Sequence, residues 1–554
     1  MHRFAVIADP HYFDIFPGYA MAGPSVGERK GASIHTLRDS AASTRLFNEG
    51  YFALPAALDL CVHHQIRHVV IAGDLTDDGQ VSAMDGAIAV LDDYEARHGL
   101  RCFLTPGNHD AYGMSGRDIT RRLLNDDGSY TVVGSASPDM ARLEQPYLHE
   151  PRQRCQAYPA LLEQWGRFGL ARRPTDLHWE TPFGPDDTVE TRFCTMTAPD
   201  GKTRQRQLDL SYLVEPEPGL WLLSIDANIF VPRDGRPDNS QADAFEDSTA
   251  AGWSALIRHK PFLVQWMRDV ARRADAMGKT LICFSHYPMV DPLDGTEALE
   301  AALLGQTMSV RRTPSSAVSN ALCATGIHTH FSGHMHIYDR AAVTAGGNTL
   351  TNYAMPSLIA FPAIIGLVSA RGKQVEIGFE RLEFDSYRDL LPAYQAELDH
   401  LGASSPMLAA TSYGDYLFRH IGEQVKTRLM IDEWPPELSA YVEGHDVQGL
   451  LALLVPHGAD IPGLLREASL AALPLSQVMT DTHALRMGSE MAFDFIPAPR
   501  LEAYRALAAF VVGTPRPPAG IAAQMHDLIS MLERFAKAGH SIQWCDACRQ
   551  AERA

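Results

Sequence analysis

The sequence predicts an α/β layered domain followed by a mainly helical domain. Short apolar runs of strand length recur up to about residue 380, and amphipathic helical patterns separate the first of them. After residue 385 the character of the sequence becomes helical. Because a chain of 554 residues is longer than one hydrophobic core usually serves, we expect two domains, at residues 1–385 and 386–554.

The strands and helices of the first domain follow from their apolar patterns. Runs of consecutive Val, Ile, Leu and Phe are typical of strands buried on both faces, and they occur at residues 3–8, 67–72, 101–105, 220–225 and 279–284. Apolar residues at helical spacing predict two helices between the first three strands, at residues 50–65 and 81–99. This alternation of strands and helices is the basis of the α/β prediction.

Three long segments interrupt the alternation, and we expect insertions at about residues 13–49, 111–215 and 229–252. Loops of this length in a compact domain tend to be lids or binding elements. Candidates for substrate contact in or near them are His35, Arg38, Asn228 and, further along the chain, Tyr353. A surface or packing role suits each of these side chains at least as well.

The second domain shows amphipathic stripes, for example at residues 416–429 and 521–539, where Gly539 is a plausible helix cap. These stripes predict helix–helix packing. The sequence leaves open whether the helical domain forms a homo-oligomer, caps the active site or binds a regulator. The single CxxC motif, Cys545 to Cys548, has no second motif to complete a zinc site, so an ordinary surface pair is the favoured interpretation.

Composition and charge limit the classes of function. Hydrophobic residues make up 45% and charged residues 21%, as in ordinary globular proteins. A formal net charge of -19 argues against a binder of nucleic-acid polymers, whose backbones favour basic surfaces. The sequence has no apolar run of about 18 residues, so no membrane span is expected. The first apolar stretch, residues 4–8, is too short for a signal peptide, and we therefore expect a cytoplasmic protein.

Polar side chains follow the predicted strands at the point where each strand ends. They are Asp9 and His11, Asp74 and Asp77, Asn108 with His109 and Asp110, His286, and finally His334 and His336. Ligands of α/β sheets bind at the carboxyl ends of strands. Imidazole suits Fe, Zn, Mn and Co, whereas carboxylate and amide oxygens suit Mn and Mg. Two metal ions about 3.5–4 Å apart are a common centre for attack on phosphorus.

The order of these motifs, DxH, GDxxD, GNHD, a single His and GHxH, resembles the calcineurin-like metallophosphoesterases. Among them, bacterial cyclic-nucleotide phosphodiesterase-like members are the most similar. The resemblance covers about residues 1–385 and implies a four-layer αββα sandwich of two mixed sheets. The resemblance does not extend to the helical domain at residues 386–554.

The resemblance also implies a role for each motif residue. It assigns the first metal ion to Asp9, His11, Asp74 and His336, and the second to Asp74, Asn108, His286 and His334. Asp74 is then the bridge, since a carboxylate has two oxygens. The metals implied are Mn²⁺ and Fe²⁺ or Fe³⁺, with Zn²⁺, Co²⁺ and Ni²⁺ as alternatives.

The resemblance makes His109 and Asp77 the catalytic pair. His109, with Asn108, is expected to contact the substrate phosphoryl group, and His109 is a candidate to protonate the leaving oxygen. Asp77 is expected to orient His109 and favour its protonated form, a role that Asp110 could fill instead. The implied reaction is in-line attack on phosphorus by a hydroxide that bridges the metals.

Three functions are compatible with this reading. We favour a phosphodiesterase that acts on a small nucleotide-like substrate such as a cyclic nucleotide. A broad phosphomonoesterase or nucleotidase is the alternative within the enzyme class. A non-catalytic metal-containing scaffold is the alternative from another class, although all the expected ligands are present. The partner expected in the first two cases is a small-molecule phosphate ester.

Overall fold

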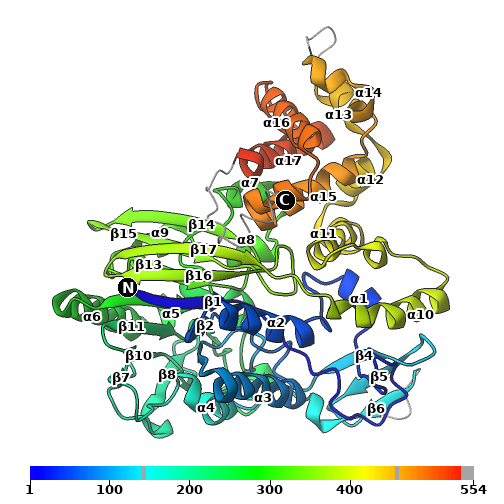
Figure 1. Ribbon diagram of the computed structural model, residues 1–554. Helices are drawn as coiled ribbons and strands as arrows, with labels where there is room; N and C mark the ends of the chain where they lie inside the picture. Colours follow the sequence, from blue (N-terminus) through cyan, green and yellow to red (C-terminus); the bar gives the residue numbers. More distant parts are fainter. Residues whose placement is uncertain (139–144, 456–460, 538–554) are drawn as a thin grey trace.

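A computed structural model describes residues 1–138, 145–455 and 461–537. Two mixed β-sheets face each other at its centre (Figure 1). The first has five strands in the order β17-β16-β1-β2-β3. Their bounds are β1 His2–Ile7, β2 His68–Ile71, β3 Arg101–Leu104, β16 Ile364–Arg371 and β17 Gln374–Arg381. Strands β1, β2 and β3 are parallel, and β16 and β17 run antiparallel at the other edge.

The second sheet has seven strands in the order β14-β15-β13-β12-β11-β10-β7. Its central strands β11, β12, β13 and β15 are parallel. The bounds are β7 His178–Glu180, β10 Tyr212–Glu217, β11 Leu220–Ile225, β12 Thr280–Ser285, β13 Thr329–Ser332, β14 Asp339–Ala345 and β15 Asn348–Ala354. Every strand predicted from an apolar run is therefore present, within two residues of the expected bounds.

Helices cover the outer face of each sheet, so the domain is an αββα sandwich as predicted. Helices α2 (Gly50–His63) and α3 (Val81–His98) lie against the five-stranded sheet (Figure 1). Helices α5 (Gly252–His259), α6 (Pro261–Met277) and α9 (Ser316–Cys323) cover the seven-stranded sheet and bury a separate apolar cluster there. Between the sheets, the ring of Phe4 meets the ring of Phe331 edge to face at 6.2 Å.

The segment 111–215, expected to be an insertion, is one only in part. It holds a small separate sheet of β4 (Thr120–Leu124), β5 (Tyr130–Gly134) and β6 (Tyr147–His149), helix α4 (Tyr158–Trp165), and the pair β8 (Phe193–Thr197) and β9 (Arg204–Leu208). However, it also supplies β7 and β10, two strands of the seven-stranded sheet. The polar sequence around them hid both strands from pattern analysis, and β7 is in addition a three-residue strand at the edge of the sheet.

The remaining helices frame one end of the sandwich. Two short ones, α7 (Glu297–Leu304) and α8 (Met308–Arg312), lie beneath the C-terminal helices, and α1 (Leu37–Ala41) contacts α11 (Figure 1). The C-terminal helices are α10 Leu391–Leu401, α11 Tyr413–Gln424, α12 Pro436–Gly444, α13 Val447–Leu454, α14 Ala468–Ala471, α15 Leu475–Gly488, α16 Ala498–Val512 and α17 Gly520–Lys537. A π-helical segment, η9 (Val425–Glu433), continues α11.

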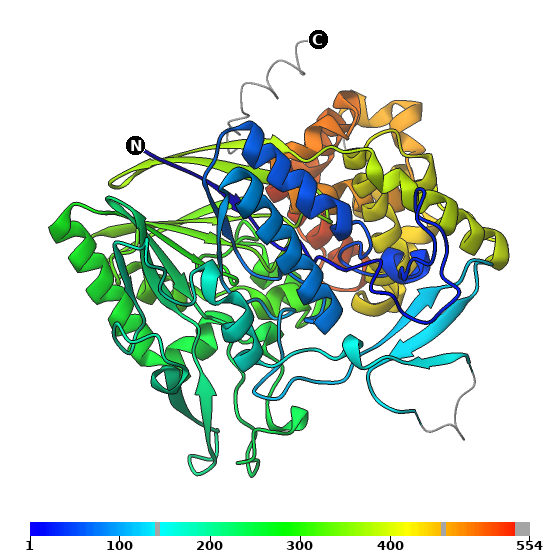
Figure 2. The same cartoon turned by 60° about the horizontal axis from the view of Figure 1, so that its bottom comes forward.

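The helical character of the C-terminal region is thus confirmed, and its position against the sandwich is visible from a second side (Figure 2). The boundary at residue 385 stays a prediction. Gly539, Cys545 and Cys548 lie outside the described residues. Among the described residues, no helix has the length and apolar character needed to cross a bilayer.

Candidate metal centre

The carboxyl ends of five strands from both sheets meet at one edge of the sandwich and bring the seven expected ligands together. Asp9 and His11 follow β1, Asp74 follows β2, Asn108 follows β3, His286 follows β12, and His334 and His336 follow β13. All seven are buried. Residues that are far apart in the sequence therefore share one small volume, as the sequence predicts from parallel strands.

The backbone at this edge is held in conformations that ordinary residues avoid. Positive φ angles occur at Asp9 (48°), His11 (44°), Asp74 (47°), His334 (69°) and His336 (56°). Such angles cost of order 1–3 kcal/mol each and persist where the surrounding structure imposes them, which is often at functional sites.

Two glycines make room for the two aspartates. A Cβ atom at Gly107 would overlap Oδ1 of Asp74, and one at Gly333 would overlap Oδ2 of Asp9. The glycines of the GNHD and GHxH motifs are thus explained by close approach of backbone to carboxylate.

The first group of ligand atoms surrounds His11. Its Nε2 atom lies 3.1 Å from Nε2 of His336, 3.9 Å from Oδ1 of Asp9 and 3.7 Å from Oδ2 of Asp74. Nε2 of His336 is 3.5 Å from Oδ1 of Asp9. Asp9, His11 and His336 together have the spacing of a metal site.

The second group surrounds His286. Its Nε2 atom lies 3.2 Å from Oδ2 of Asp74, 3.1 Å from Oδ1 of Asn108 and 3.1 Å from Nδ1 of His334. Asp9, Asp74 and His286 also have the spacing of a metal site. Oδ2 of Asp74 therefore stands between His11 and His286, which is the position a bridging carboxylate needs, and Asp9 borders both groups.

Hydrogen bonds outside the cluster aim the ligand atoms into it. Nδ1 of His286 donates to the carbonyl of Ala72 at 3.0 Å, and Nε2 of His334 donates to the carbonyl of Thr249 at 2.9 Å. Because a carbonyl only accepts, each of these nitrogens carries a proton, and the other ring nitrogen is the one that can bind a metal ion. The backbone N–H of His334 donates to both carboxylate oxygens of Asp9 at 3.0 Å.

The cluster carries negative charge that bound cations would balance. Asp9 and Asp74 are buried, and among the described residues their ion-pair partners are histidines, not lysine or arginine. Burial lowers the pKa values of His11 and His334 well below normal, so both are neutral imidazoles, as metal ligands must be. Although burial opposes it, Asp74 and Asp9 raise the pKa of His286 to about 9. The same negative charge favours a metal ion at that nitrogen, so the residues present fit two metal ions.

The family comparison agrees with this geometry. The model of the calcineurin-like phosphoesterase family matches residues 2–179, which contain the DxH, GDxxD and GNHD motifs. This region is a calcineurin-like phosphoesterase domain. Members of the family bind two metal ions, and the cluster supplies candidate ligands for both. The nearer resemblance to bacterial cyclic-nucleotide enzymes stays a prediction.

Solved structures similar to the chain include a dimetal phosphatase from Danio rerio (14% identity, 69% of this chain and 98% of that chain, TM-score 0.34). They also include the sulfate thiohydrolase SoxB of Thermus thermophilus in complex with glycerol (13% identity, 72% of this chain and 60% of that chain, TM-score 0.29). A third is the phosphopantetheinyl hydrolase of Mycobacterium tuberculosis (11% identity, 64% of this chain and 90% of that chain, TM-score 0.23). These likenesses are weak and carry no argument about function. No curated protein matches the sequence.

His109 lies beside the metal centre of the phosphoesterase domain, but its partner differs from the expected one. Its ring is 5.1 Å from that of His11, and its Nδ1 atom is 2.8 Å from Oδ1 of Asp78. Asp77, the expected partner, instead accepts a hydrogen bond from Arg45 at 2.8 Å. Sequence could not separate two adjacent aspartates, because the turn after Asp74 decides which of them faces His109.

The expected protonated form of His109 is not favoured either. Burial first, and then the positive charge of Arg45 3.3 Å from Nδ1, lower the pKa of His109 to about 4, although Asp74 and Asp77 oppose the shift. Asp110, the other carboxylate considered, accepts hydrogen bonds from the backbone N–H groups of Thr76 and Gly107, both at 2.9 Å. Asp110 therefore holds the two motif loops together and does not orient His109.

The four candidates for substrate contact take packing or remote positions. Asn228 is buried and donates to the carbonyl of Gly107 at 2.9 Å. His35 stacks on Phe47, and Tyr353 stacks on Phe331. Arg38 lines a different cavity.

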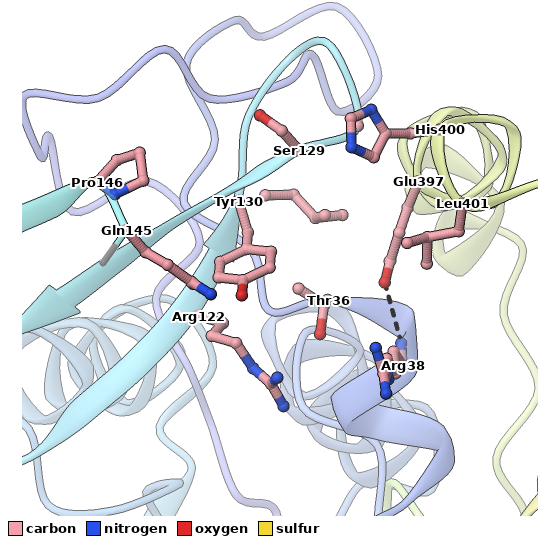
Figure 3. A pocket seen from close by; sticks show the side chains of 12 residues that line it. Thr36, Arg38, Arg122, Ser129, Tyr130, Gln145, Pro146, Glu397, His400 and Leu401 are labelled. Atoms are coloured by element: carbon pink, nitrogen blue, oxygen red, sulfur yellow. Dashed lines mark hydrogen bonds between the residues drawn. The ribbon is translucent and has the colours of Figure 1, made fainter. Parts of the chain in front are cut away.

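That other cavity, about 290 Å³, lies between the small sheet β4–β6 and helices α1 and α10 (Figure 3). Glu397 borders it and accepts a hydrogen bond from the backbone N–H of Arg38 at 3.2 Å. None of the seven ligands lines it. Arg38 is therefore placed away from the metal centre.

A second cavity adjoins the candidate metal centre. Its lining includes His334 and His336, together with Arg312 at the end of α8, Arg428 in η9 and Arg486 in α15. Sequence analysis missed these arginines, as it missed Asp78 and Arg45. None of the arginines belongs to a motif, and two of them come from the helical region.

Proposed function

We propose that the phosphoesterase domain hydrolyses a phosphodiester of a small nucleotide-like molecule with two metal ions bound at the centre. One observation supports this most directly: Oδ2 of Asp74 lies 3.7 Å from His11 and 3.2 Å from His286, between two sets of lone pairs. An arrangement of this kind suits two neighbouring metal ions and has no evident role in packing, since buried carboxylates without cations are costly.

In this proposal the first metal ion is held by Asp9, His11, Asp74 and His336, and the second by Asp74, Asn108, His286 and His334. When bound, two such ions supply a water activated near neutral pH and positive charge beside the phosphoryl group. The mixed imidazole and carboxylate set favours Mn²⁺ or Fe²⁺.

The protein's own groups then orient the substrate. The backbone N–H of His109 donates to Oδ1 of Asp74 at 2.7 Å. This hydrogen bond fixes the position of His109 relative to the bridging carboxylate. Nδ1 of His109 donates to Asp78, so Nε2 is the ring atom that can take up a proton and then donate it to a phosphoryl or leaving-group oxygen. Asn108 lies within the second ligand set and next to His109, as expected for a residue close to the phosphoryl group.

The lining of the cavity beside the centre is the reason to prefer a diester over a monoester. The cavity is small, about 80 Å³, and next to His334 and His336 it presents apolar side chains, among them Ile337, Leu429 and Met487, which suit the apolar part of a second ester group. A broad phosphomonoesterase or nucleotidase is the second candidate, because the arginines beside the centre suit a dianionic phosphate.

Turnover of bis(p-nitrophenyl) phosphate and p-nitrophenyl phosphate tests the proposal, with Mn²⁺, Fe²⁺ or Co²⁺ added. We expect a higher kcat/KM for the diester. The variant His109→Ala should lose turnover but keep its metal, and His98→Ala, which changes an exposed histidine of α3, serves as the control. A preference for the monoester would favour the phosphomonoesterase. No turnover with any of the three metals would contradict the enzyme and leave the metal-containing scaffold.

A further inference from the structure

Three arginines form one wall of the cavity that opens onto the metal centre. Arg312, Arg428 and Arg486 line it together with His334 and His336. Arg312 belongs to α8, and Arg428 and Arg486 belong to the helical region. All three lie outside the residues that match the family. We call these three residues the arginine wall.

Of the three arginines, Arg312 has the positive charge that neighbouring carboxylates balance least. Among the described residues it has no ion-pair partner, and its Nε atom is buried without a hydrogen bond. Burial lowers the pKa of Arg312, and the positive charges of Arg428 and Arg45 lower it further, against the opposing effect of Tyr287 and Asp74. Arg312 is half-buried, and an anion bound beside it would balance a charge that the described residues leave without a carboxylate partner.

The other two arginines have one carboxylate each. Nε of Arg428 is 3.2 Å from Glu433, and Arg486 is 2.8 Å from Glu300. The wall therefore has three cations for two carboxylates. His483, which also lines the cavity, does not change this balance at neutral pH, because burial and then Arg486 and Arg428 lower its pKa to about 3.

The wall lies within electrostatic reach of the reacting site. After burial, the charge of Arg312 is the largest influence that lowers the pKa of His334, and it also acts on His109. A chain with a net charge of -19 thus concentrates positive charge at a cavity that adjoins its candidate metal centre. Clefts of this kind attract and orient anionic ligands.

We propose that the arginine wall binds a second phosphate group of the substrate, beside the phosphate that is hydrolysed. Guanidinium groups bind phosphate oxygens through paired hydrogen bonds, and phosphate supplies the charge that Arg312 lacks. This inference rests on the proposed phosphodiesterase function and narrows it. A cyclic mononucleotide has a single phosphate and would leave the wall unpaired, whereas a nucleotide-like diester with a further phosphate would fill it.

A pair of chromogenic substrates tests the wall. Both are p-nitrophenyl esters of thymidine 5′-phosphate, one with a free 3′-hydroxyl and one with a 3′-phosphate. We expect the wild-type chain to cleave the bisphosphate with a kcat/KM about 10–100-fold higher, the range of one or two hydrogen bonds to a charged group. Arg428→Gln should reduce this preference about tenfold, mainly through KM.

Matched variants separate charge from folding. Arg428→Lys should retain part of the preference, because it keeps the charge but loses the paired geometry. Arg312→Gln should lower turnover of both esters. Turnover of the ester with a 3′-phosphate should fall more than that of the ester with a free 3′-hydroxyl. Arg534→Gln, which changes an exposed arginine of α17, should keep the wild-type preference.

Two failures can be told apart. If the wild-type chain hydrolyses neither ester nor bis(p-nitrophenyl) phosphate, the proposed function fails. If the wild-type chain hydrolyses both esters, the proposed function holds. If each of the variants Arg428→Gln and Arg312→Gln then slows the two esters by the same factor, the second-phosphate site is refuted.

Discussion

Asp74 and Glu49 are both buried carboxyl groups, yet their surroundings shift their pKa values in opposite directions. Asp74 lies beside His286, whose positive charge overcomes burial and keeps the pKa of Asp74 well below normal. Burial raises the pKa of Glu49 from 4.5 to about 7, although the hydroxyl groups of Tyr416 and Tyr394 donate to it at 3.0 and 3.1 Å. Neutral hydroxyl donors do not compensate a buried charge as a cation does.

The difference separates a candidate metal site from a structural contact. Asp74 is charged, has a φ angle of 47° and lies between His11 and His286. Glu49 connects the N-terminal end of α2 to helices α10 and α11 of the helical region through two tyrosine hydroxyl groups. Burial of a carboxyl group is therefore a poor indicator of function, whereas the identity of its neighbours is a good one.

The largest effect is expected at Asp74. Asp74→Asn removes the bridging charge and should lower turnover of bis(p-nitrophenyl) phosphate by roughly 1,000-fold or more, about 4 kcal/mol. Bound metal per chain, measured by atomic emission, should fall with it. Full metal content and normal turnover would contradict the bridging role.

Glu49→Gln should instead change the pH dependence of stability. The folded-state pKa of Glu49 is raised, so its contribution to stability is complete below pH 4.5 and is lost as the pH rises through about 7. The variant should match the wild type near pH 5 and be more stable by roughly 3 kcal/mol at pH 8. Urea unfolding at the two pH values measures this. Turnover should be unchanged, and a stability difference independent of pH would contradict the assignment.

Gly107→Ala should act on Asp74 through the backbone. The added Cβ would overlap Oδ1 of Asp74, so the carboxylate must move, and metal affinity should fall about 10–100-fold, as for other groups that support a ligand. Gly444→Ala is the control, because nothing lies within 4 Å of a Cβ there. Equal metal titration curves for both variants would show that Asp74 does not need this space.

The smallest effect is expected at Asp78. Asp78→Asn weakens the contact to Nδ1 of His109 and should lower kcat about tenfold while metal content is kept. Asp118→Asn changes an exposed carboxylate nearby and should have no effect. If Asp78→Asn lost its metal as Asp74→Asn does, the division between ligand and supporting carboxylate would be wrong.

The sequence by itself predicted an α/β layered domain from its apolar runs, and the αββα sandwich from the resemblance of its motifs to a known family. The set of polar residues at one edge of the sandwich depends on local signals: a buried strand is visible as an apolar run, and Asp9, Asp74 and His286 follow such runs within two residues. Parallel strands then require their carboxyl ends to meet, so proximity in space follows from position in the chain. The strands β7 and β10 were not predicted, because they lie within a long polar segment.

Only the tertiary structure decided which groups face the centre without belonging to a motif. The turn after Asp74 directs Asp78 to His109 and Asp77 to Arg45. The packing of the helical region on the sandwich brings Arg428 and Arg486 beside Arg312. An arginine on a helix has no signature in sequence, because the same residue on the opposite face would be an ordinary solvated charge. Its role depends on what packs against it, and that depends on the whole fold.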